Sequence, residues 1–377
     1  MNEPTIIAIT GKWHSDNKSI SKTAEKLLNI LCPISKEVIT ISSNIPINNF
    51  NSKHHGIVIK SRSNNNSNLL EQMYTSLYKL KVTVVMIQLI LSQKIDIIIF
   101  CFGADLFLIP IIVSRIFAKK TIIRTDSRPS VANTYKNKRT IKYIIYRLIE
   151  RINYSLAHII ISEAQHMINY YELLPYTKKI EIGTLYVEDY FFMKNNFNLK
   201  KYDIGFIGRF SEEKGFSDFI ESLKEISQIH PGLNVLIIGD GNLKYKLKEL
   251  SNYKIEVNYI GWIEKQNLPQ YLSKLKFLIL PSYKEGLPNI VLEAMACGTV
   301  VLATPVGGIP DLLKDKKTGF SLKDNSPECI TKNVLCALNC QYTHDIISSA
   351  HYLMEQKYSY QKVLDNYQKI IADVISK

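Results

Sequence analysis

Residues 277–304 have the sequence FLILPSYKEGLPNIVLEAMACGTVVLAT, which decides the fold. Two short apolar runs, FLILPS (277–282) and TVVLAT (299–304), lie on either side of a segment with the composition of a helix. A strand, a crossover helix and a second strand form the repeating unit of a parallel sheet, because parallel strands need such a connection. The stretch therefore predicts one strand–helix–strand unit of an α/β domain.

Similar units extend in both directions along the 377 residues, a length for which two domains are the default. The other strands predicted in the second half are DIGFIG (203–208), NVLIIG (234–239) and EVNYIG (256–261). Those predicted in the first half are TIIAIT (5–10), EVITIS (37–42), IDIIIFCF (95–102), TIIRTD (121–126) and HIIISE (158–163). These continuous, Ile-rich runs are typical of parallel strands that are covered on both faces. The pattern breaks at residues 186–199, where we expect a linker.

The segment before the helix indicates an anion-binding site. Pro288 suits the first helical position, and Gly298 suits the residue just past the helix end. Leu287 stands where a capping residue is expected, so the first backbone N–H groups lack a side-chain partner and can bind an anion. Glu285 and Glu293 lie eight positions apart across this turn and helix. We expect a ligand with a phosphate at the helix start and hydroxyls for the carboxylates.

These residues resemble the donor-binding motif of retaining glycosyltransferase family 4 (glycosyl transferases group 1), whose members have the GT-B fold. The family pattern Glu-x7-Glu is matched by Glu285 and Glu293. Upstream, YDIGFIGRFSEEKG (202–215) resembles the family's Gly-Arg…Glu-Lys-Gly element and supplies Arg209 and Lys214. The segment NVLIIGDG between them resembles the family's second strand and glycine turn. Three matches in the same order make the resemblance specific, whereas Glu-x7-Glu alone occurs by chance on many helices.

The resemblance implies two Rossmann-like doubly wound domains that face a cleft, with ligands at the carboxyl ends of the strands. It assigns residues 1–185 to an acceptor-side domain, 186–200 to the linker and 201–355 to a domain that binds a UDP- or GDP-linked sugar. A helix at 356–377 is expected to return to the first domain.

The implied catalytic residues are Arg209 and Lys214, which bind the diphosphate, and Glu285, which orients the donor sugar. Glu293 is implied to take the ribose hydroxyls. The other implied donor-binding residues are Gly208, Gly239, Gly241, Gly286, Leu287, Asn289 and Ile290.

The chemistry suits these residue types. Arg and Lys form charge-assisted hydrogen bonds to phosphate oxygens, and losing a group that stabilises the leaving diphosphate should cost roughly 10²–10³ in rate. An ionised carboxylate accepts hydrogen bonds from vicinal hydroxyls. Two simpler interpretations stay open. Arg209 and Lys214 could form surface ion pairs, for instance with Glu212 or Glu213, and Glu293 could occupy an exposed helix position.

The resemblance weakens toward the N-terminus. A glycine-rich loop after the first strand is reduced to Gly11, and Asp126 stands where the family often has His. Near the domain junction, IGTLYVED (182–189) replaces the usual Asn-Gly-Val-Asp. The candidate acceptor residues are Gly11, His14 and Asp126; for Asp126, a satisfied carboxylate at a strand end is the alternative.

Charge is concentrated in the first half, because residues 1–195 carry 25 Lys and Arg against 14 Asp and Glu, most of the +13 total. An anionic partner or surface explains this asymmetry, and so does an A+T-rich coding sequence. Within 136–152, Ile141, Ile145 and Leu148 belong to an apolar stripe beside many cations. The stripe predicts contact with an anionic membrane, and a helix that covers the sheet is the alternative.

Other features narrow the location. The start MNEPTIIAIT enters a strand directly, so we expect no signal peptide, and the apolar runs 81–91 and 106–118 are too short to span a bilayer. Six cysteines without metal spacing favour a reducing cytosol. The predicted location is the cytoplasm, with possible peripheral attachment to the membrane.

The predicted function is a retaining glycosyltransferase that moves a sugar from a nucleotide-diphosphate sugar to a glycan or lipid-linked acceptor, in polysaccharide or glycolipid biosynthesis. No cofactor is expected, and no metal, since no Asp-x-Asp pair ends a strand. The alternatives are a catalytically silent sugar-nucleotide-binding subunit and another GT-B enzyme, such as a nucleotide-sugar epimerase. No nucleic-acid motif accompanies the positive charge, so a nucleic acid is not an expected partner.

Overall fold

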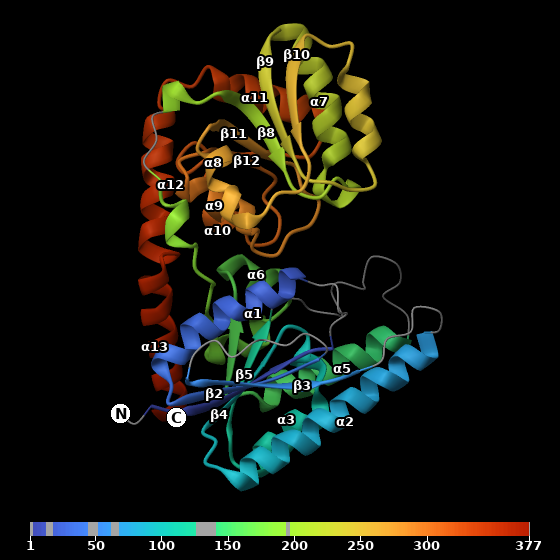
Figure 1. Ribbon diagram of the computed structural model, residues 1–377, viewed down its shortest axis with the longest axis vertical. Coiled ribbons are helices and arrows are strands. Elements are labelled where there is room, and N and C mark those ends of the chain that lie inside the picture. The colour runs from blue at the N-terminus through green and yellow to red at the C-terminus, as the bar shows by residue number, and fades with distance from the viewer. Residues whose placement is uncertain are drawn as a thin grey trace. The chain divides into compact units, whose positions relative to one another are not determined.

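The computed structural model describes residues 3–12, 18–43, 52–61, 68–125, 141–193 and 197–376. It divides into two compact units (Figure 1). The first comprises Met1–Glu163, Ile168–Leu185 and Val363–Lys377, and the second comprises Ala164–Met167 and Tyr186–Lys362. The segment 186–200, predicted as a linker, is thus counted with the second unit, where Val187 and Phe191 are buried.

The first unit is built on a parallel sheet with the strand order β3-β2-β1-β4-β5-β6-β7. The strands are β1 (Thr5–Thr10), β2 (Glu37–Ser43), β3 (His54–Ile59), β4 (Ile97–Cys101), β5 (Lys120–Thr125), β6 (Ile159–Ser162) and β7 (Ile180–Ile182). Every residue of the central strands β1 and β4 is buried, as expected for a sheet covered on both faces.

Helices cover this sheet. They are α1 (Lys18–Leu31), α2 (Asn68–Ser92), α3 (Leu108–Ile116), α5 (Ile141–Leu156), α6 (Gln165–Tyr170) and α13 (Tyr360–Ser376), with short 3₁₀ turns η1 (Cys32–Ile34), η2 (Ala104–Leu106) and η4 (Leu174–Lys179). Helices α2, α3 and α5 form one layer, since α3 packs against both of the others (Figure 1). Helix α13 is counted with the first unit from Val363 onward.

The apolar run 81–91 is the second half of the 25-residue helix α2. The run was expected to be too short to span a bilayer, but the helix is longer than the run. Its first turns contain polar residues, so they were not part of the apolar run. Residues Leu70–Ser92 are long and apolar enough to cross a membrane by length and composition alone. Tyr78, Val82 and Met86 are nevertheless fully buried, so α2 packs on the first unit with one side from Tyr78 onward.

The second unit contains a parallel sheet with the order β10-β9-β8-β11-β12-β13. Its strands are β8 (Tyr202–Ile207), β9 (Leu233–Ile238), β10 (Ile255–Ile260), β11 (Leu275–Leu280), β12 (Val300–Ala303) and β13 (Phe320–Ser321). Its helices are α7 (Phe216–Ile229), α8 (Pro269–Leu272), α9 (Asn289–Ala296), α10 (Ile309–Leu312), α11 (Pro327–Leu338) and α12 (Thr343–Lys357). Its 3₁₀ turns are η5 (Asp189–Phe191), η6 (Phe197–Leu199), η7 (Glu212–Lys214), η8 (Lys244–Leu250) and η9 (Lys265–Asn267).

Two hydrophobic clusters fill the two faces of this sheet, because successive side chains of a strand point to opposite faces. Leu278 and Leu280 of β11 belong to the cluster that contains α9 and part of α12. Phe277 and Ile279 of the same strand belong to the cluster that contains α7 and part of α11. Because both faces of this sheet are covered by apolar side chains, polar side chains that could bind a ligand are expected in the loops at the strand ends.

Candidate active site

The candidate site in the second unit is built on neighbouring strands. β8 and β11 pair directly, and β9 pairs with the other side of β8. Arg209 follows β8, Gly239 follows β9 and Glu285 follows β11, each shortly after the carboxyl end of its strand. Parallel strands end at the same edge of a sheet, where α/β domains bind their ligands. The structure therefore brings the three sequence segments singled out above to one edge.

Lys214 and Glu285 form an ion pair at this edge. The Lys214 Nζ lies 2.7 Å from Oε1 and 2.8 Å from Oε2 of the Glu285 carboxylate. Ser282 Oγ donates a further hydrogen bond of 2.6 Å to Oε1. Glu285 is buried, and its burial is tolerable because an ammonium and a hydroxyl both satisfy the carboxylate. The Lys214 ammonium carries three donors, so it can contact a further anion while it holds Glu285.

The backbone binds the same loops together. Tyr283 N donates to Glu213 O at 2.9 Å, which ties the loop after β11 to η7. Gly215 has φ +66°, and a Cβ there would lie 1.9 Å from Pro281 O. Only glycine fits this crossing, since a side chain meets both a strained backbone and a carbonyl oxygen. The glycine places Lys214 against the loop that carries Glu285.

The predicted Gly208, Gly239 and Gly241 serve a similar contact. A Cβ on Gly239 would lie 1.9 Å from Gly208 O, and one on Gly241 would lie 2.4 Å from Phe210 O. Phe210 N donates to Asp240 O at 2.9 Å across the same junction. These glycines let the backbones of the loops after β8 and β9 contact each other. Arg209 lies between Gly208 and Phe210 in the first of these loops, so the contact fixes the position of its backbone.

Helix α9 begins at Asn289, one residue later than predicted, and Pro288 rather than Leu287 is its N-cap. The proline has an extended conformation with ψ 116°, which holds it outside the helix. No side chain caps this end, as predicted, and Gly298 follows the helix with φ +67°. The side chains of Leu287 and Ile290 pack against the core, so their backbone groups are what they can offer a ligand.

The loop after β12 also supports the start of α9. Gly308 N donates to Gly286 O at 2.8 Å. Gly307 has φ +61°, and a Cβ there would lie 2.1 Å from Glu285 O. The loop after β12 is therefore in contact with the backbone of Glu285 and Gly286, and any side chain at position 307 would displace them.

Glu293 is buried inside α9, so the alternative of an exposed helix position is wrong. Its Oε1 lies 2.8 Å from Lys265 Nζ, and the same Nζ lies 2.8 Å from Glu188 Oε1. Burial opposes the charge of Lys265, but the two carboxylates outweigh it and raise the pKa of this ammonium. Sequence reasoning missed Lys265 and Glu188; the available signal was a lysine shortly after the carboxyl end of β10.

Arg209 differs from the other cations of the site. Its side chain is exposed, and within the described part of the chain no ion pair or hydrogen bond holds its guanidinium. A planar group with five donors at a strand edge is well suited to a phosphate. The alternative of a surface ion pair is not realised for Arg209 among the described residues.

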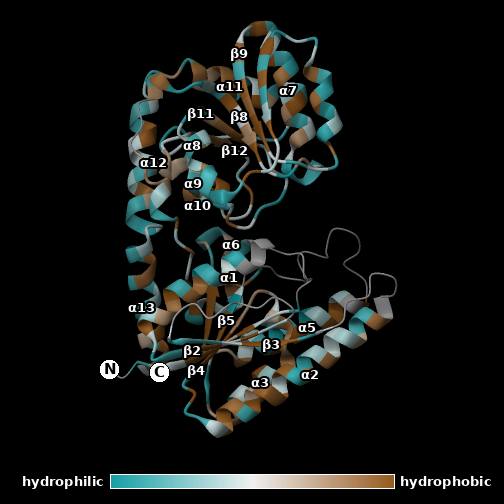
Figure 2. Cartoon of the chain, in the orientation of Figure 1, coloured by the Kyte–Doolittle hydropathy of each residue, from teal (hydrophilic) through white to brown (hydrophobic). Residues whose placement is uncertain are grey.

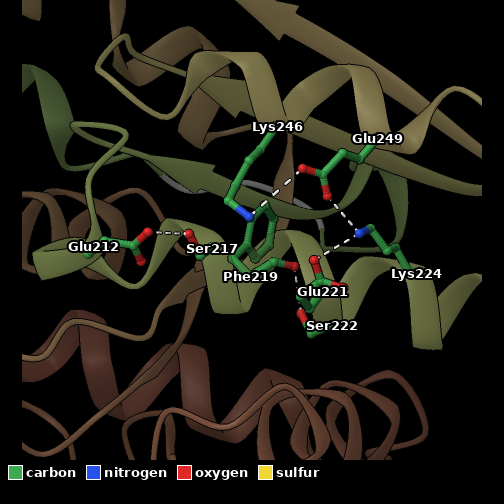
Figure 3. A network of polar contacts seen from close by, with 8 residues as sticks. All are labelled: Glu212, Ser217, Phe219, Glu221, Ser222, Lys224, Lys246 and Glu249. Carbon is green, nitrogen blue, oxygen red and sulfur yellow. Dashed lines mark hydrogen bonds and ion pairs between the residues drawn. The ribbon is translucent and has the colours of Figure 1, made fainter.

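The suggested partners of Lys214 are also engaged differently. Glu212 Oε1 accepts a hydrogen bond of 2.8 Å from Ser217 Oγ at the start of α7, as Figure 3 shows. Further along α7, Lys224 Nζ lies 2.8 Å from Glu221 and 2.7 Å from Glu249 (Figure 3). This network attaches α7 to η8 and leaves Lys214 to Glu285.

Of the candidate acceptor residues, only Gly11 is described. It follows β1, donates its N–H to Phe102 O at 3.1 Å, and leaves no room for a Cβ, which would lie 2.6 Å from that oxygen. Its packing against the loop after β4 accounts for the glycine without a ligand. His14 and Asp126 lie outside the described residues, as do Lys136, Lys138 and Arg139 of the predicted membrane segment.

The second unit, which contains this site, is similar to a known protein family. Residues 188–356 match the family described as Glycosyl transferases group 1. An uncharacterized glycosyltransferase of Methanocaldococcus jannaschii is 26% identical over 181 residues, which are 47% of this chain and 50% of that protein. The chain thus spans half the length of this relative. An alpha-1,4-N-acetyl-D-galactosaminyltransferase of Campylobacter jejuni is 23% identical over 65% of this chain and 68% of its own.

The fold has solved counterparts. HepE of Anabaena, solved in complex with UDP, superposes with a TM-score of 0.71 at 14% identity, over 100% of each chain. This likeness concerns the fold, and it confirms the prediction of a GT-B protein made of two doubly wound α/β units.

Proposed function

We propose that the chain is a member of the glycosyl transferases group 1 family, whose model residues 188–356 match, and that it transfers a sugar from a nucleotide-diphosphate sugar to an acceptor hydroxyl. One observation carries the proposal: Arg209 and the uncapped start of α9 lie at the same sheet edge. Arg209 has no ion-pair partner among the described residues. A guanidinium and a helix N-terminus both favour a dianionic group.

In this proposal the donor diphosphate lies between Arg209, Lys214 and the start of α9. Negative charge grows on the phosphate as the glycosidic bond breaks, and groups that are already fixed in place stabilise that charge most. The close backbone contacts at Gly215 and Gly239 supply this rigidity. Three positive elements can perform the role that a divalent cation has in other transferases, so we propose a metal-independent reaction without a cofactor.

The carboxylates take the hydroxyls of the donor. Glu285, held by Lys214 and Ser282, orients the sugar ring, and Glu293, held by Lys265, takes the ribose hydroxyls. Each carboxylate has a fixed cation beside it, so its position is set before the ligand binds. We propose retention of the anomeric configuration, in which the departing phosphate accepts the proton of the acceptor hydroxyl.

The acceptor we propose is a glycan or a lipid-linked saccharide on the cytoplasmic side of a membrane, as in polysaccharide or glycolipid biosynthesis. The name of the Campylobacter jejuni relative, which specifies an undecaprenol-linked glycan, supports this class of acceptor. The relative and this chain share low identity, so the support concerns the class and not the sugar.

Nucleotide binding tests the donor site directly. UDP and GDP, each with and without an attached hexose, are compared by thermal shift on the wild-type protein and on the variants Arg209→Met and Lys248→Met. A ligand at 100 times its Kd should stabilise the fold by about 2.7 kcal/mol, and Arg209→Met should remove most of this gain. Lys248 is exposed on η8 and is not among the predicted site residues, so its variant should behave as wild type. No shift with either nucleotide would refute the site.

Catalysis needs a second measurement. Slow release of free sugar from the matching donor, with and without EDTA, separates an enzyme from a silent binding subunit, and NMR of the first-formed product reports its anomeric configuration. We expect release that EDTA does not change and a product of retained configuration; tight binding without release would favour the silent subunit.

A further inference from the structure

Three helices of the first unit expose most of the large apolar side chains that the described residues leave in water. Figure 2 colours the residues of these helices, α2, α3 and α5, by their hydropathy. Helix α2 contributes Leu70, Met73, Leu77, Leu80, Val84 and Leu91; α3 contributes Ile109, Ile112 and Ile116; α5 contributes Ile141, Ile144, Ile145, Leu148 and Ile152. We call these side chains the aliphatic face. Several are almost fully open, with Leu91 72%, Ile116 74% and Ile141 77% exposed.

The aliphatic face is continuous across the layer. α3 packs against both α2 and α5, and each of the three helices buries its opposite side. Tyr78, Val82 and Met86 are the buried side of α2, Ile111 is buried on α3, and Tyr154 is buried on α5. The five α5 residues are the stripe that the sequence pattern singled out, and the structure exposes them instead of burying them against the sheet.

Helix α2 gives the face its length. Its exposed apolar residues recur at three- and four-residue steps from Leu70 to Val84, and Leu91 follows seven residues later, which keeps them on one side of the helix. Its 25 residues extend over about 38 Å. Soluble monomers rarely expose a contiguous apolar area of this kind unless it binds something.

The exposed charges carried by the three helices of the face have one sign, and the half-exposed Glu172 beside α5 is paired with Arg147. The exposed charged side chains of the face are Lys81 on α2, Arg115 on α3 and Arg151 on α5. The only acids within the described parts of these helices are turned away: Glu71 pairs with Lys12 at 2.6 Å, and Glu150 is fully buried. A surface of aliphatic side chains edged by cations and without exposed acids on its helices is complementary to anionic lipid headgroups above an acyl layer.

We propose that the aliphatic face of α2, α3 and α5 is a docking surface for an anionic lipid bilayer, on which the first unit lies with α2 parallel to the membrane plane. Protein interfaces are enriched in aromatic side chains at their centre, whereas this face holds only Leu, Ile, Val and Met. A bilayer accepts such side chains without matching their shape, and each cation near the surface adds to the attraction.

Helix α2 does not have to leave its domain to do this. The Tyr78 hydroxyl donates to Thr10 O at 3.1 Å, and this bond with the buried side chains around it holds α2 on the sheet. Crossing the bilayer would expose that polar contact to hydrocarbon and open the core of the first unit. Lying in the interface buries the exposed side alone.

Vesicle co-sedimentation of the full chain tests the proposal. Wild-type protein is mixed with vesicles of phosphatidylcholine alone or of phosphatidylcholine with phosphatidylglycerol. One variant carries Leu77→Gln, Ile112→Gln and Leu148→Gln, one change on each helix, and a second carries Lys81→Glu and Arg151→Glu. The control variant carries Leu199→Gln, Ile229→Gln and Val257→Gln, three exposed apolar positions of the second unit.

Wild type and control should sediment with the anionic vesicles, and the triple variant on the face should partition at least about tenfold less, since three large apolar contacts are lost. The charge variant should lose its preference for phosphatidylglycerol. Equal sedimentation of the face variant and the control would overturn the proposal. So would a wild-type dimer in sedimentation velocity that the face variant converts to a monomer while lipids bind neither, because the occupant would then be a second copy of the chain.

This proposal does not depend on the donor site. The face variant should keep the thermal shift that wild type shows with its nucleotide. Loss of vesicle binding with an intact nucleotide shift is the expected result, whereas vesicle binding without any nucleotide shift would support the docking surface and refute only the proposed function.

Discussion

Lys214 and Glu285 are 71 positions apart in sequence and form one ion pair in the structure. Their meeting depends on loops that touch through the backbone, so the positions of both side chains are set before any ligand arrives. Such preorganisation makes single substitutions at this pair informative, because the surrounding loops have little freedom to compensate.

Glu285→Gln keeps the shape of the side chain and removes its charge. We expect the turnover of donor to fall roughly 10²–10³-fold, because the amide neither fixes the Lys214 ammonium nor orients the sugar hydroxyls as a carboxylate does. Steady-state release of sugar measures the change. Glu213→Gln is the matched control, since Glu213 is exposed and contributes its backbone carbonyl to the loop contact. Unchanged turnover in the Glu285 variant would remove this residue from the proposed site.

The variants Gly307→Ala and Gly232→Ala separate the effect of backbone strain on stability from the effect of a steric clash. Both glycines have positive φ, +61° and +84°, but a Cβ at 232 meets nothing within 4 Å, whereas one at 307 lies 2.1 Å from Glu285 O. The Gly232 variant should lose about 1–2 kcal/mol from backbone strain alone. The Gly307 variant should lose more and should also weaken nucleotide binding, because the start of α9 must shift. Urea unfolding and thermal shift measure both effects, and equal losses would argue against the contact.

At the scale of elements, α13 is attached to the first unit by a buried phenol, that of Tyr367, and by the Asn366 amide, which donates to Ile182 O at 2.7 Å. The Tyr367 hydroxyl accepts a hydrogen bond from Arg124 Nε at 3.3 Å and donates one to Gly183 O at 3.1 Å. Arg124 is fully buried on β5 and also pairs with Glu163 at 2.7 Å. Val363, Ile370 and other apolar residues of α13 are buried on the same side of the helix.

Tyr367→Phe should lower the free energy of unfolding by about 1–3 kcal/mol, since it leaves a buried guanidinium and a carbonyl without this partner. Amide hydrogen exchange should speed up along α13 more than elsewhere. Tyr352→Phe on the exposed side of α12 is the control and should change stability little. The role assigned to the hydroxyl fails if both variants are equally stable.

The elements also show what pattern analysis can reach. All ten predicted strands form, within about two residues of their predicted bounds, because buried parallel strands are continuous apolar runs. The strands that were missed are β3, β7 and β13, and each lies at an edge of its sheet. An edge strand is partly solvated, so its sequence does not need an apolar run; β3 begins with two histidines and β13 has two residues.

The site was predictable to a similar degree. The positions of Arg209 and Glu285 near strand ends, and of Glu293 inside the helix, follow from local pattern. The partners do not, because Lys214 with Glu285 and Lys265 with Glu188 are contacts between distant segments that no local period encodes. The helix start was misplaced by one residue because Pro288 suits both the N-cap and the first helical position.

For the whole molecule, a buried lysine predicts how stability depends on pH. Lys200 Nζ donates to Leu275 O at 3.0 Å and Gly298 O at 2.8 Å. Burial lowers the pKa of this ammonium from its ordinary 10.5 to about 8. The folded protein therefore releases the proton more readily than the unfolded chain, which still holds it up to about pH 10.

The unfolded state binds more protons in this window, so the free energy of unfolding should rise with pH between about 8 and 10, by up to about 1.4 kcal/mol per pH unit. Below pH 8 this contribution should be flat. Urea unfolding at several pH values measures the slope, and Lys200→Met should abolish it whatever its effect on stability itself. An identical slope in that variant would assign the dependence to other groups.

The return of the chain to the first unit at Val363 bears on how such proteins can be recombined. Neither half corresponds to one uninterrupted stretch of gene. A chimera that takes residues 1 to about 186 from a related protein through a single crossover would keep the α13 of this chain, and the hydroxyl of Tyr367 would then meet whatever residue replaces Arg124. Exchange of the first unit therefore requires two splice points, so that α13 comes from the same protein as the rest of that unit.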